Sequence, residues 1–251
     1  MHKGYVYCAG STAAARYAAD YLQSHGTPVS CNTGLHIRHL LLDVPSFLPD
    51  GRLRGGGNLD TLLAALPRDV LIYGGNLQQA TLEEYQTVDF LKDPLYLAKN
   101  AAITADCTLQ IAMPLLPTTL HKLPVLIIGW GRIGKCLAQT MHALGCDVTV
   151  AARKEADRAL LQALHYNAVD PADLEASLPC FRLICNTAPE MVIHEKLASK
   201  CKNCVKIDLA SQQGIAGEDV IWARGLPGIH APESSGILIA ETFIRYRKEE
   251  S

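Results

Sequence analysis

The sequence has little net charge and no long apolar run. It contains 23 Lys and Arg residues against 25 Asp and Glu residues, which gives a formal net charge of −2. Such a chain has no overall field that would draw it onto nucleic acid or an anionic membrane, so an anionic ligand has to be held by local cations. No apolar run approaches the ~20 residues that a membrane-spanning helix needs. Arg16 and Asp20 interrupt the N-terminal segment where a signal peptide has its apolar region. We therefore expect neither nucleic acid nor a membrane among its partners.

A second absence is a cysteine pattern typical of disulfides or of zinc. The nine cysteines are odd in number and scattered, and Cys136, Cys146 and Cys185 stand within apolar segments. Disulfide-stabilised domains are usually short, secreted and evenly paired. Cys201 and Cys204 have the spacing of a metal-binding pair, but no second Cys or His pair follows at a suitable distance for a four-ligand site. We expect reduced thiols, a cytoplasmic protein and no metal.

What the sequence does contain is an alternation of short apolar segments and helical patterns. Hydrophobic residues make up 49% of the 251 residues, enough for a sizeable core. The alternation is typical of parallel β-α-β units with right-handed crossovers. The expected strands are 4–10, 40–46, 69–76, 124–129, 147–153, 181–187, 204–211 and 219–225. The expected helices are 11–26, 58–67, the second half of 93–116, 132–144, 155–164, 191–200 and 234–247.

The clearer alternation in the second half predicts the domain organisation. An N-terminal α/β domain covers 1–100, a linking helix covers 101–122 and a nucleotide-binding Rossmann domain covers 123–233. The final helix, in about 234–251, carries Ile237, Ala240 and Ile244 along one face. We expect this face to pack back onto the N-terminal domain.

The most informative motif is Gly129-Trp130-Gly131-Arg132-Ile133-Gly134, which matches G-x-G-x-x-G. It follows an apolar strand and opens a helix, the context in which this motif binds a dinucleotide. The first glycine permits a tight turn, the second lets the backbone approach a pyrophosphate, and the third allows close packing of helix on strand. The helix N-terminus then offers N–H groups and a partial positive charge to the phosphates.

The residues that follow the next strand favour NADP over NAD. NAD-binding proteins commonly place Asp or Glu about twenty residues after the glycine loop, where it holds the ribose 2′-hydroxyl. This sequence has Arg153 and Lys154 there. Arg153 can hold a 2′-phosphate through two hydrogen bonds, whereas a carboxylate would repel it. The alternative is that both residues are a solvated helix start and that NAD is held by backbone groups.

Polar residues follow three later strands, where open α/β sheets bind their ligands. Asn186 and Thr187 are candidates for contacts with the ribose or nicotinamide, and Asp208 and Ser211 for contacts with a substrate. His230 has a side chain suited to acid–base chemistry at neutral pH. Turn and cap formation explains the same residue types equally well. The spacing singles out no base.

Four segments occur in a distinctive order and spacing. They are VLIIGWGRIGKCLAQTMHALGCDVTVAARK (125–154), ICNTAPEMVI (184–193), VKIDLASQQG (205–214) and RGLPGIHAPESSGILIAE (224–241). This series resembles the family of the dipicolinate synthase A subunit from spore-forming bacteria, over about residues 100–242. In its general domain pattern the sequence also resembles D-2-hydroxyacid dehydrogenases and the NAD domains of adenosylhomocysteinases.

The resemblance implies a fold, a reaction and partners. The fold would be α/β, with two Rossmann-like domains linked by crossing helices, the C-terminal one a doubly wound parallel sheet that binds NADP. The reaction would be the NADP-dependent oxidation of a hydroxytetrahydro- or dihydrodipicolinate, a small dicarboxylate from the lysine pathway, to dipicolinate during sporulation. A flavoprotein-like B subunit would be the partner, in the cytoplasm of the mother cell, and assembly into a homo-oligomer stays open.

The resemblance also implies roles for residues at matching positions. Those expected to bind the cofactor are Gly129, Trp130, Gly131, Arg132, Ile133, Gly134, Arg153, Lys154, Asn186, Thr187, Pro189 and Asp208. Those expected near the substrate are Thr104, Arg224, Gly225, Pro227 and Gly228. The candidates for catalysis are Asp106, Asp208, Ser211 and His230.

Four positions depart from the family pattern. Ser11 stands in a loop that is glycine–aspartate–arginine in the family, Asp106 replaces a glutamate, Gly214 follows Gln213 where the family has two glycines, and Glu233 replaces a lysine. These positions cluster on the expected substrate side. Two alternatives follow: another small-acid dehydrogenase, of the 2-hydroxyacid kind, or a nucleotide-binding subunit that has lost catalysis.

Overall fold

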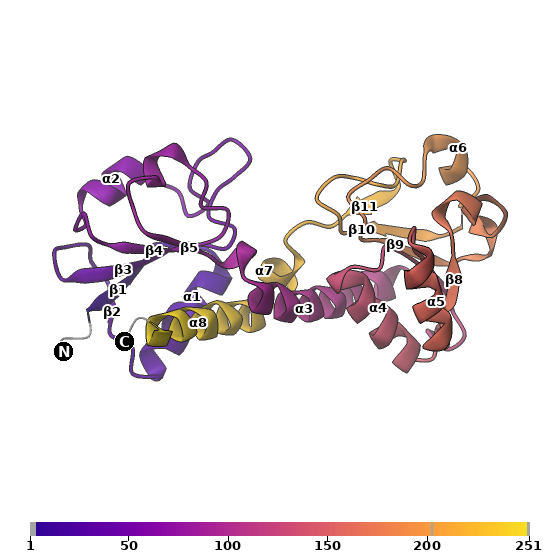
Figure 1. The fold of residues 1–251 in the computed structure, drawn as a ribbon, viewed down its shortest axis with the longest axis horizontal. Helices are drawn as coiled ribbons and strands as arrows, with labels where there is room; N and C mark the ends of the chain where they lie inside the picture. Colours follow the sequence, from indigo (N-terminus) through magenta and orange to yellow (C-terminus); the bar gives the residue numbers. More distant parts are fainter. Residues whose placement is uncertain (1–3, 202, 250–251) are drawn as a thin grey trace. The chain divides into compact units, whose positions relative to one another are not determined.

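The structure is a computed structural model that describes residues 4–201 and 203–249. By its internal contacts the chain divides into two units, residues 1–100 with 227–251, and residues 101–226. Each unit has a parallel sheet of its own, as Figure 1 shows. We call them the N-terminal unit and the nucleotide unit. The assignment of separate roles to two domains stays a prediction.

The N-terminal unit is built on a five-stranded parallel sheet with the order β2-β1-β3-β4-β5. Its strands are β1 (Tyr5–Cys8), β2 (Val29–Ser30), β3 (Ile37–Leu41), β4 (Leu71–Gly74) and β5 (Thr87–Asp89). The chain leaves β1 in one direction to β2 and returns on its other side to β3. The crevice of such a doubly wound sheet therefore lies at the carboxyl ends of β1 and β3.

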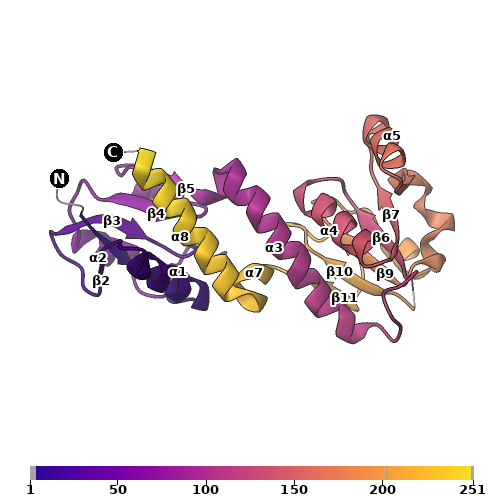
Figure 2. The ribbon, with the colours of Figure 1, turned by 90° about the horizontal axis from the view of Figure 1, so that it is seen from below.

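Helices cover both faces of this sheet. They are α1 (Ala13–Ser24), α2 (Leu59–Ala64) and α8 (Pro232–Glu249), with short 3-10 turns at η1 (Ala80–Leu82) and η2 (Phe90–Lys92). α8 lies against α1 on one face and α2 covers the other (Figure 2). A side chain at Gly236 of α8 would overlap the backbone of α1 at Ala14 and Ala18, so the glycine allows this close packing. Lys99 pairs with Glu241 at 2.9 Å, and Asp93 pairs with Arg245.

The nucleotide unit contains a six-stranded parallel sheet with the order β11-β10-β9-β6-β7-β8. The strands are β6 (Pro124–Ile128), β7 (Asp147–Ala151), β8 (Asn167–Val169), β9 (Leu183–Asn186), β10 (Val205–Asp208) and β11 (Val220–Trp222). Counted from β6, this is the order 3-2-1-4-5-6 of dinucleotide-binding sheets. The predicted α/β class with a doubly wound parallel C-terminal sheet is confirmed.

Apolar layers cover both faces of β6. Val125 and Ile127 face a core formed with α3 (Pro94–Ala112), α4 (Arg132–Ala143) and α5 (Glu155–Ala163). Leu126 and Ile128 face a second core that includes Leu174 and Leu178, from the 3-10 turns η4 (Pro171–Ala176) and η5 (Leu178–Cys180). Because successive side chains alternate and both faces are covered, a parallel strand reads as one continuous apolar run. The remaining elements of the chain are η3 (Met113–Leu115), α6 (Glu195–Ala198) and α7 (Leu226–His230).

Several predicted elements have different limits. The helix expected from the second half of 93–116 begins at Pro94, because the Asp93 carboxylate accepts a hydrogen bond from the Leu95 N–H at 2.8 Å and caps it. The helix expected at 191–200 is only α6, because Ile193 pairs with Ile215 in a β-bridge. The strand expected at 40–46 is β3, which lies at 37–41.

Other differences are short elements that carry little sequence signal. β2, β5 and β8 have two or three residues each, too few for a recognisable apolar alternation. The region 225–232, expected to be a loop, contains α7. Gly225 turns the chain at a φ of +66°, and Pro227 then suits the first turn of a helix.

Among the described residues, no helix combines the length and apolar character that crossing a membrane requires.

Candidate nucleotide-binding site

The glycine loop joins β6 to α4 at the centre of the nucleotide unit. A side chain on Gly129 would meet the Thr187 hydroxyl at 2.6 Å, and φ is +100° at this residue. A side chain on Gly134 would overlap the carbonyl oxygen of Gly129. At Gly131, by contrast, an added Cβ would have no described atom within 4 Å. Two glycines are therefore required by the protein itself, and the third keeps the space over the loop open.

The N-terminus of α4 faces this open space. Gly131 is the N-cap residue and provides no side-chain cap, so the first N–H groups of the helix remain available to an anion. Beside it, the indole Nε1 of Trp130 is buried and has no hydrogen-bond partner among the described residues. Trp130 packs edge-on against Tyr166, with ring centroids 6.1 Å apart. An open glycine loop and an unpaired donor both fit a bound polar group.

A cleft of about 250 Å³ opens at the carboxyl ends of β6, β7 and β9. Ligand pockets usually have about 300–1,000 Å³, so this one accommodates one part of a dinucleotide. Of the predicted cofactor residues it is lined by Gly129, Trp130, Gly131, Arg153, Lys154, Thr187 and Pro189. Arg132, Ile133 and Gly134 lie in the first turn of α4, outside the lining.

Arg153 projects from the end of β7 into this cleft and meets a carboxylate there. Its Nη1 lies 2.6 Å from Oε2 of Glu190, which follows β9 on another wall of the cleft. Both side chains are exposed, at 73% and 56%, so the ion pair contributes little to stability and opens easily. Lys154 is the exposed N-cap residue of α5. Sequence reasoning missed Glu190, although it stands next to the predicted Pro189.

Arg158 holds the backbone from which Arg153 projects. Its Nη1 donates to the carbonyl oxygens of Ala152 and Arg153, at 2.8 and 2.7 Å. The same nitrogen lies 2.8 Å from a carboxylate oxygen of Asp170. Arg158 is thus half-buried, with its Nη1 engaged at the backbone and at Asp170, whereas Arg153 and Lys154 are exposed cations at this strand end.

Asn186 and Asp208 lie beneath the cleft rather than in its lining. Asp208 is fully buried, and its carboxylate accepts four hydrogen bonds, from Asn186 Nδ2 and from the backbone N–H groups of Ala210, Gly214 and Ile215, at 2.7–3.1 Å. The acceptor sites of this carboxylate are thus taken up by groups of the protein. In this arrangement Asp208 orders the segment after β10.

Gly214 connects that segment to the loop that carries Glu190. Its carbonyl oxygen accepts from the N–H groups of Val192 and Ile193, at 2.8 and 3.0 Å. Any side chain at Gly214 would overlap the carbonyl of Glu190, so only glycine fits between the two loops. Asn186 also binds both polar backbone groups of Ala188. The backbone on either side of Glu190 is therefore anchored.

The other predicted residues are spread over further elements. Arg224 donates to the carbonyl of Ser211, and its guanidinium carbon lies 5.7 Å from the centre of the Trp222 ring. Thr104 is buried in α3, whereas Asp106 is exposed on it. Gly228 and His230 are exposed in α7, and Pro227 is buried there. None of these residues lines the cleft at the glycine loop.

Three buried or half-buried thiols of the nucleotide unit, Cys185, Cys201 and Cys204, are not activated. Burial raises the pKa of Cys204 to about 12, and it raises the pKa values of Cys185 and Cys201 as well. Thiolates are the reactive form of cysteine, so these side chains are inert at neutral pH. In the described part of the chain no three His, Cys, Asp or Glu side chains gather as a metal site would require.

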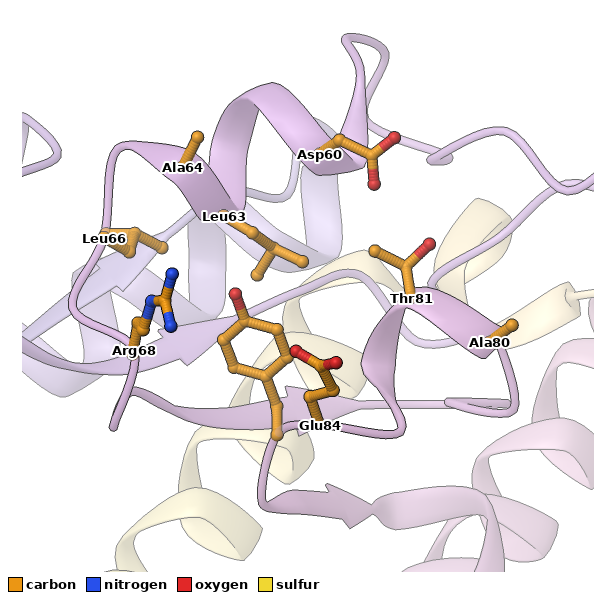
Figure 3. Close-up of a pocket in the computed structure, with 9 residues that line it drawn as sticks. Asp60, Leu63, Ala64, Leu66, Arg68, Ala80, Thr81 and Glu84 are labelled. Atoms are coloured by element: carbon orange, nitrogen blue, oxygen red, sulfur yellow. The ribbon is translucent and has the colours of Figure 1, made fainter.

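A second pocket lies within the N-terminal unit. Figure 3 shows Asp60 and Leu63 of α2 on one side of it and Ala80, Thr81 and Glu84 on the other, with Arg68 at one end. Its charged side chains are exposed and differ in sign. None of its lining residues was among the predicted site residues.

Fold and site together define a class. The sheet order, the open glycine loop and the cleft at the carboxyl ends of its strands are those of Rossmann-like nucleotide-binding proteins. In agreement, residues 98–206 match the family model "D-isomer specific 2-hydroxyacid dehydrogenase, NAD binding domain". The match indicates a nicotinamide dinucleotide as the class of cofactor.

The more particular resemblance is to the A subunit of dipicolinate synthase. The chain is 29% identical to this protein from Bacillus subtilis over 159 residues, 60% of this chain and 54% of the relative. The matched region thus spans about half the length of that relative. Crystal structures of the dipicolinate synthase A subunit from Bacillus halodurans and Bacillus subtilis have TM-scores of 0.84 and 0.81, with 19% and 22% identity. They cover 97% and 98% of this chain, and 97% and 96% of their own. The predicted resemblance is confirmed.

Proposed function

We propose that the chain is an NADP-dependent oxidoreductase subunit of the dipicolinate synthase type. The observation that carries the proposal is the open space over Gly131, next to the N-terminus of α4 and within a cleft that Arg153 lines. This combination offers N–H donors for a pyrophosphate and a cation for a 2′-phosphate. The similarity to the A subunit of dipicolinate synthase supports the assignment.

Each part of the site has a distinct task in this proposal. The glycine loop and the first turn of α4, with Arg132 and Ile133, would receive the pyrophosphate. Arg153 and Lys154 would hold the 2′-phosphate, and Thr187 and Pro189 would line the groove. Asn186 and Asp208 would act beneath the site, by fixing the loops after β9 and β10. The cofactor, when bound, accepts or donates the hydride.

The proposed substrate is a small dicarboxylate related to tetrahydrodipicolinate or dihydrodipicolinate. A dicarboxylate needs at least two cationic or N–H-rich contacts. Arg224, with Gly225, Pro227 and Gly228, is proposed to supply one of them, and Thr104 is a further candidate. For proton transfer we propose Ser211, Asp106 or His230, since the four donors to Asp208 disfavour it as the base.

Cofactor preference is the first test. The purified protein should bind NADPH more tightly than NADH in a fluorescence titration. Arg153→Glu should invert the preference, by about tenfold or more, because it exchanges attraction of the 2′-phosphate for repulsion. A Glu variant that retains the preference for NADPH would contradict the role of Arg153.

Turnover is the second part of the same test. Together with a flavoprotein-like B subunit, the proposed partner, the protein should form dipicolinate, detected by its ultraviolet absorbance. Turnover of 2-hydroxy acids without dipicolinate formation would favour a 2-hydroxyacid dehydrogenase, to which the family-model match also points. Nucleotide binding without any product would favour a subunit that has lost catalysis.

A further inference from the structure

The Arg153–Glu190 ion pair places a carboxylate in the cleft, directly against the cation proposed to hold a 2′-phosphate. From this geometry we infer that Glu190 is a specificity-determining residue, which weakens the binding of a 2′-phosphate and favours a free 2′-hydroxyl. The inference rests on the proposed binding of a nicotinamide dinucleotide in this cleft. It predicts that the wild-type protein accepts both NADP and NAD, with only a modest preference for NADP.

The position of Glu190 supports this role. Rossmann proteins that use NAD commonly present a carboxylate to the ribose from the end of the second strand. In this chain that strand, β7, ends before Arg153, and the carboxylate comes from the loop after β9 instead. Its Oε2 lies 2.6 Å from Arg153 Nη1, so both groups are within reach of the same atom of a ligand. A ribose hydroxyl can donate to the carboxylate, whereas a fully ionised phosphate has no proton to donate.

The loop holds the carboxylate near the cation when a ligand arrives. Gly214 and Asn186 anchor the backbone at Ala188, Val192 and Ile193. A 2′-phosphate that binds Nη1 of Arg153 displaces Glu190 from that nitrogen, and the carboxylate still projects from the cleft wall beside it. Because the phosphate carries a charge of about −1.5 to −2 near neutral pH, it is repelled at this short range.

Other charged groups around the cleft do not cancel this effect. Lys154 and Asp157 also line it, with opposite charges. Arg158 is engaged with the carbonyls of Ala152 and Arg153 and with Asp170. Replacing Glu190 by the neutral, equally large Gln therefore changes the local charge by one unit and leaves the shape of the cleft intact.

The experiment compares two probes of the adenosine end, adenosine 2′,5′-bisphosphate and 5′-AMP, together with NADPH and NADH. Glu190→Gln should raise the affinity for the bisphosphate and for NADPH about five- to tenfold. The affinities for 5′-AMP and NADH should change by less than about twofold or should fall. The gain should shrink as salt rises from about 0.05 to about 0.5 M, since screening reduces charge repulsion.

The matched control is Glu175→Gln. Glu175 pairs with Lys200 at 2.7 Å, is similarly exposed at 52%, and lies outside the cleft, so it changes net charge equally. It should leave all four affinities unchanged. Equal ratios of bisphosphate to 5′-AMP affinity in wild type and Glu190→Gln would overturn the inference, and so would weaker bisphosphate binding by the variant. A wild-type protein that binds neither NADPH nor NADH would instead refute the proposed function.

Discussion

The two units begin with the same local arrangement but differ in what lies at the N-terminus of its helix. In each, a first strand runs through a glycine-containing loop into a helix, α1 in the N-terminal unit and α4 in the nucleotide unit. At α4 the N-cap is Gly131, without a side-chain cap, and the space beside it is open. At α1 the N-cap is Thr12, whose hydroxyl accepts from the Ala15 N–H at 3.2 Å.

The protein also provides its own anion at α1. Asp43, buried after β3, accepts hydrogen bonds from the Thr12 hydroxyl and, at 3.2 Å, from the Ser11 N–H. The protein's own carboxylate thus takes up an N–H and a hydroxyl donor of the loop that leads into α1. A Cβ at Gly10 would lie 2.5 Å from the Cβ of Ala15 and 2.8 Å from an oxygen of Asp43, so this glycine makes room for α1 and for the carboxylate.

A strand–glycine–helix turn is therefore not by itself a phosphate site. The deciding feature is whether a side chain from a neighbouring strand end binds the donors at the start of the helix. In the nucleotide unit the neighbouring strand end supplies Thr187, which bonds to the Ile128 carbonyl and leaves the loop open. In the N-terminal unit the neighbouring strand end supplies Asp43. We therefore expect only the nucleotide unit to bind a dinucleotide.

The largest effect is expected from Asp43→Ala. It removes the acceptor of the Ser11 N–H and the Thr12 hydroxyl at a buried site, which should lower the free energy of unfolding by about 2–4 kcal/mol. Urea denaturation followed by fluorescence measures this. Asp50→Ala, at an exposed carboxylate paired with Arg52 in the same unit, should change the free energy of unfolding far less, because solvent screens an exposed ion pair. Equal costs for the two variants would mean that Asp43 is not the anchor of α1.

A pair of glycine substitutions should separate packing from binding in the nucleotide unit. Gly134→Ala overlaps the Gly129 carbonyl and should destabilise the protein by about 1–3 kcal/mol. Gly131→Ala meets no described atom, so it should change stability by less than about 1 kcal/mol and yet weaken dinucleotide binding about tenfold. Thermal melts and NADPH titrations give both quantities. Identical behaviour of the two variants would contradict the distinction between the two glycines.

The smallest effect concerns pH and should appear in both units. Burial raises the pKa of Cys8, in the N-terminal unit, and of Cys204, in the nucleotide unit, from 9.0 to about 12. Between these two pKa values the unfolded chain loses a proton that the folded chain keeps. The free energy of unfolding therefore falls as pH rises above about 9, and below about pH 9 these thiols cause no pH dependence. At about pH 10 each thiol should account for about 1 kcal/mol.

Urea midpoints at about pH 8 and about pH 10 test this prediction. Cys204→Ser removes one of the two thiols and should therefore lose less stability over this interval than the wild type. An equal loss in both proteins would show that Cys204 ionises alike in the folded and unfolded chains.

The sequence predicted the elements with strong local signals. The strand–glycine loop–helix from 124 to 143 and the Arg153 position are where the pattern placed them, because apolar periodicity and glycine spacing act over a few residues. Elements of two or three residues, such as β2 and β8, have too little pattern to be seen. Helix 191–200 was predicted too long because the bridge between Ile193 and Ile215 overrides local helical preference.

The roles of side chains could likewise be predicted where a local motif sets them, and not where distant segments do. The cleft residues that follow directly from the motif, Gly131 and Arg153, could be named from the sequence alone. Asp208 was interpreted as a substrate-facing group, although four donors, three of them from the segment after β10, surround it. Its burial depends on how two loops pack, which a single strand end does not reveal.

The parallel α/β class, the glycine loop and the basic end of the second strand of the nucleotide unit follow from the sequence, since these depend on neighbours along the chain. The contact of Asp43 with the loop before α1 and the contact of Glu190 with Arg153 are visible only in the folded structure. In parallel sheets, strands far apart in the sequence end at the same edge, so the residues that fill or charge a crevice come from segments that no local pattern links.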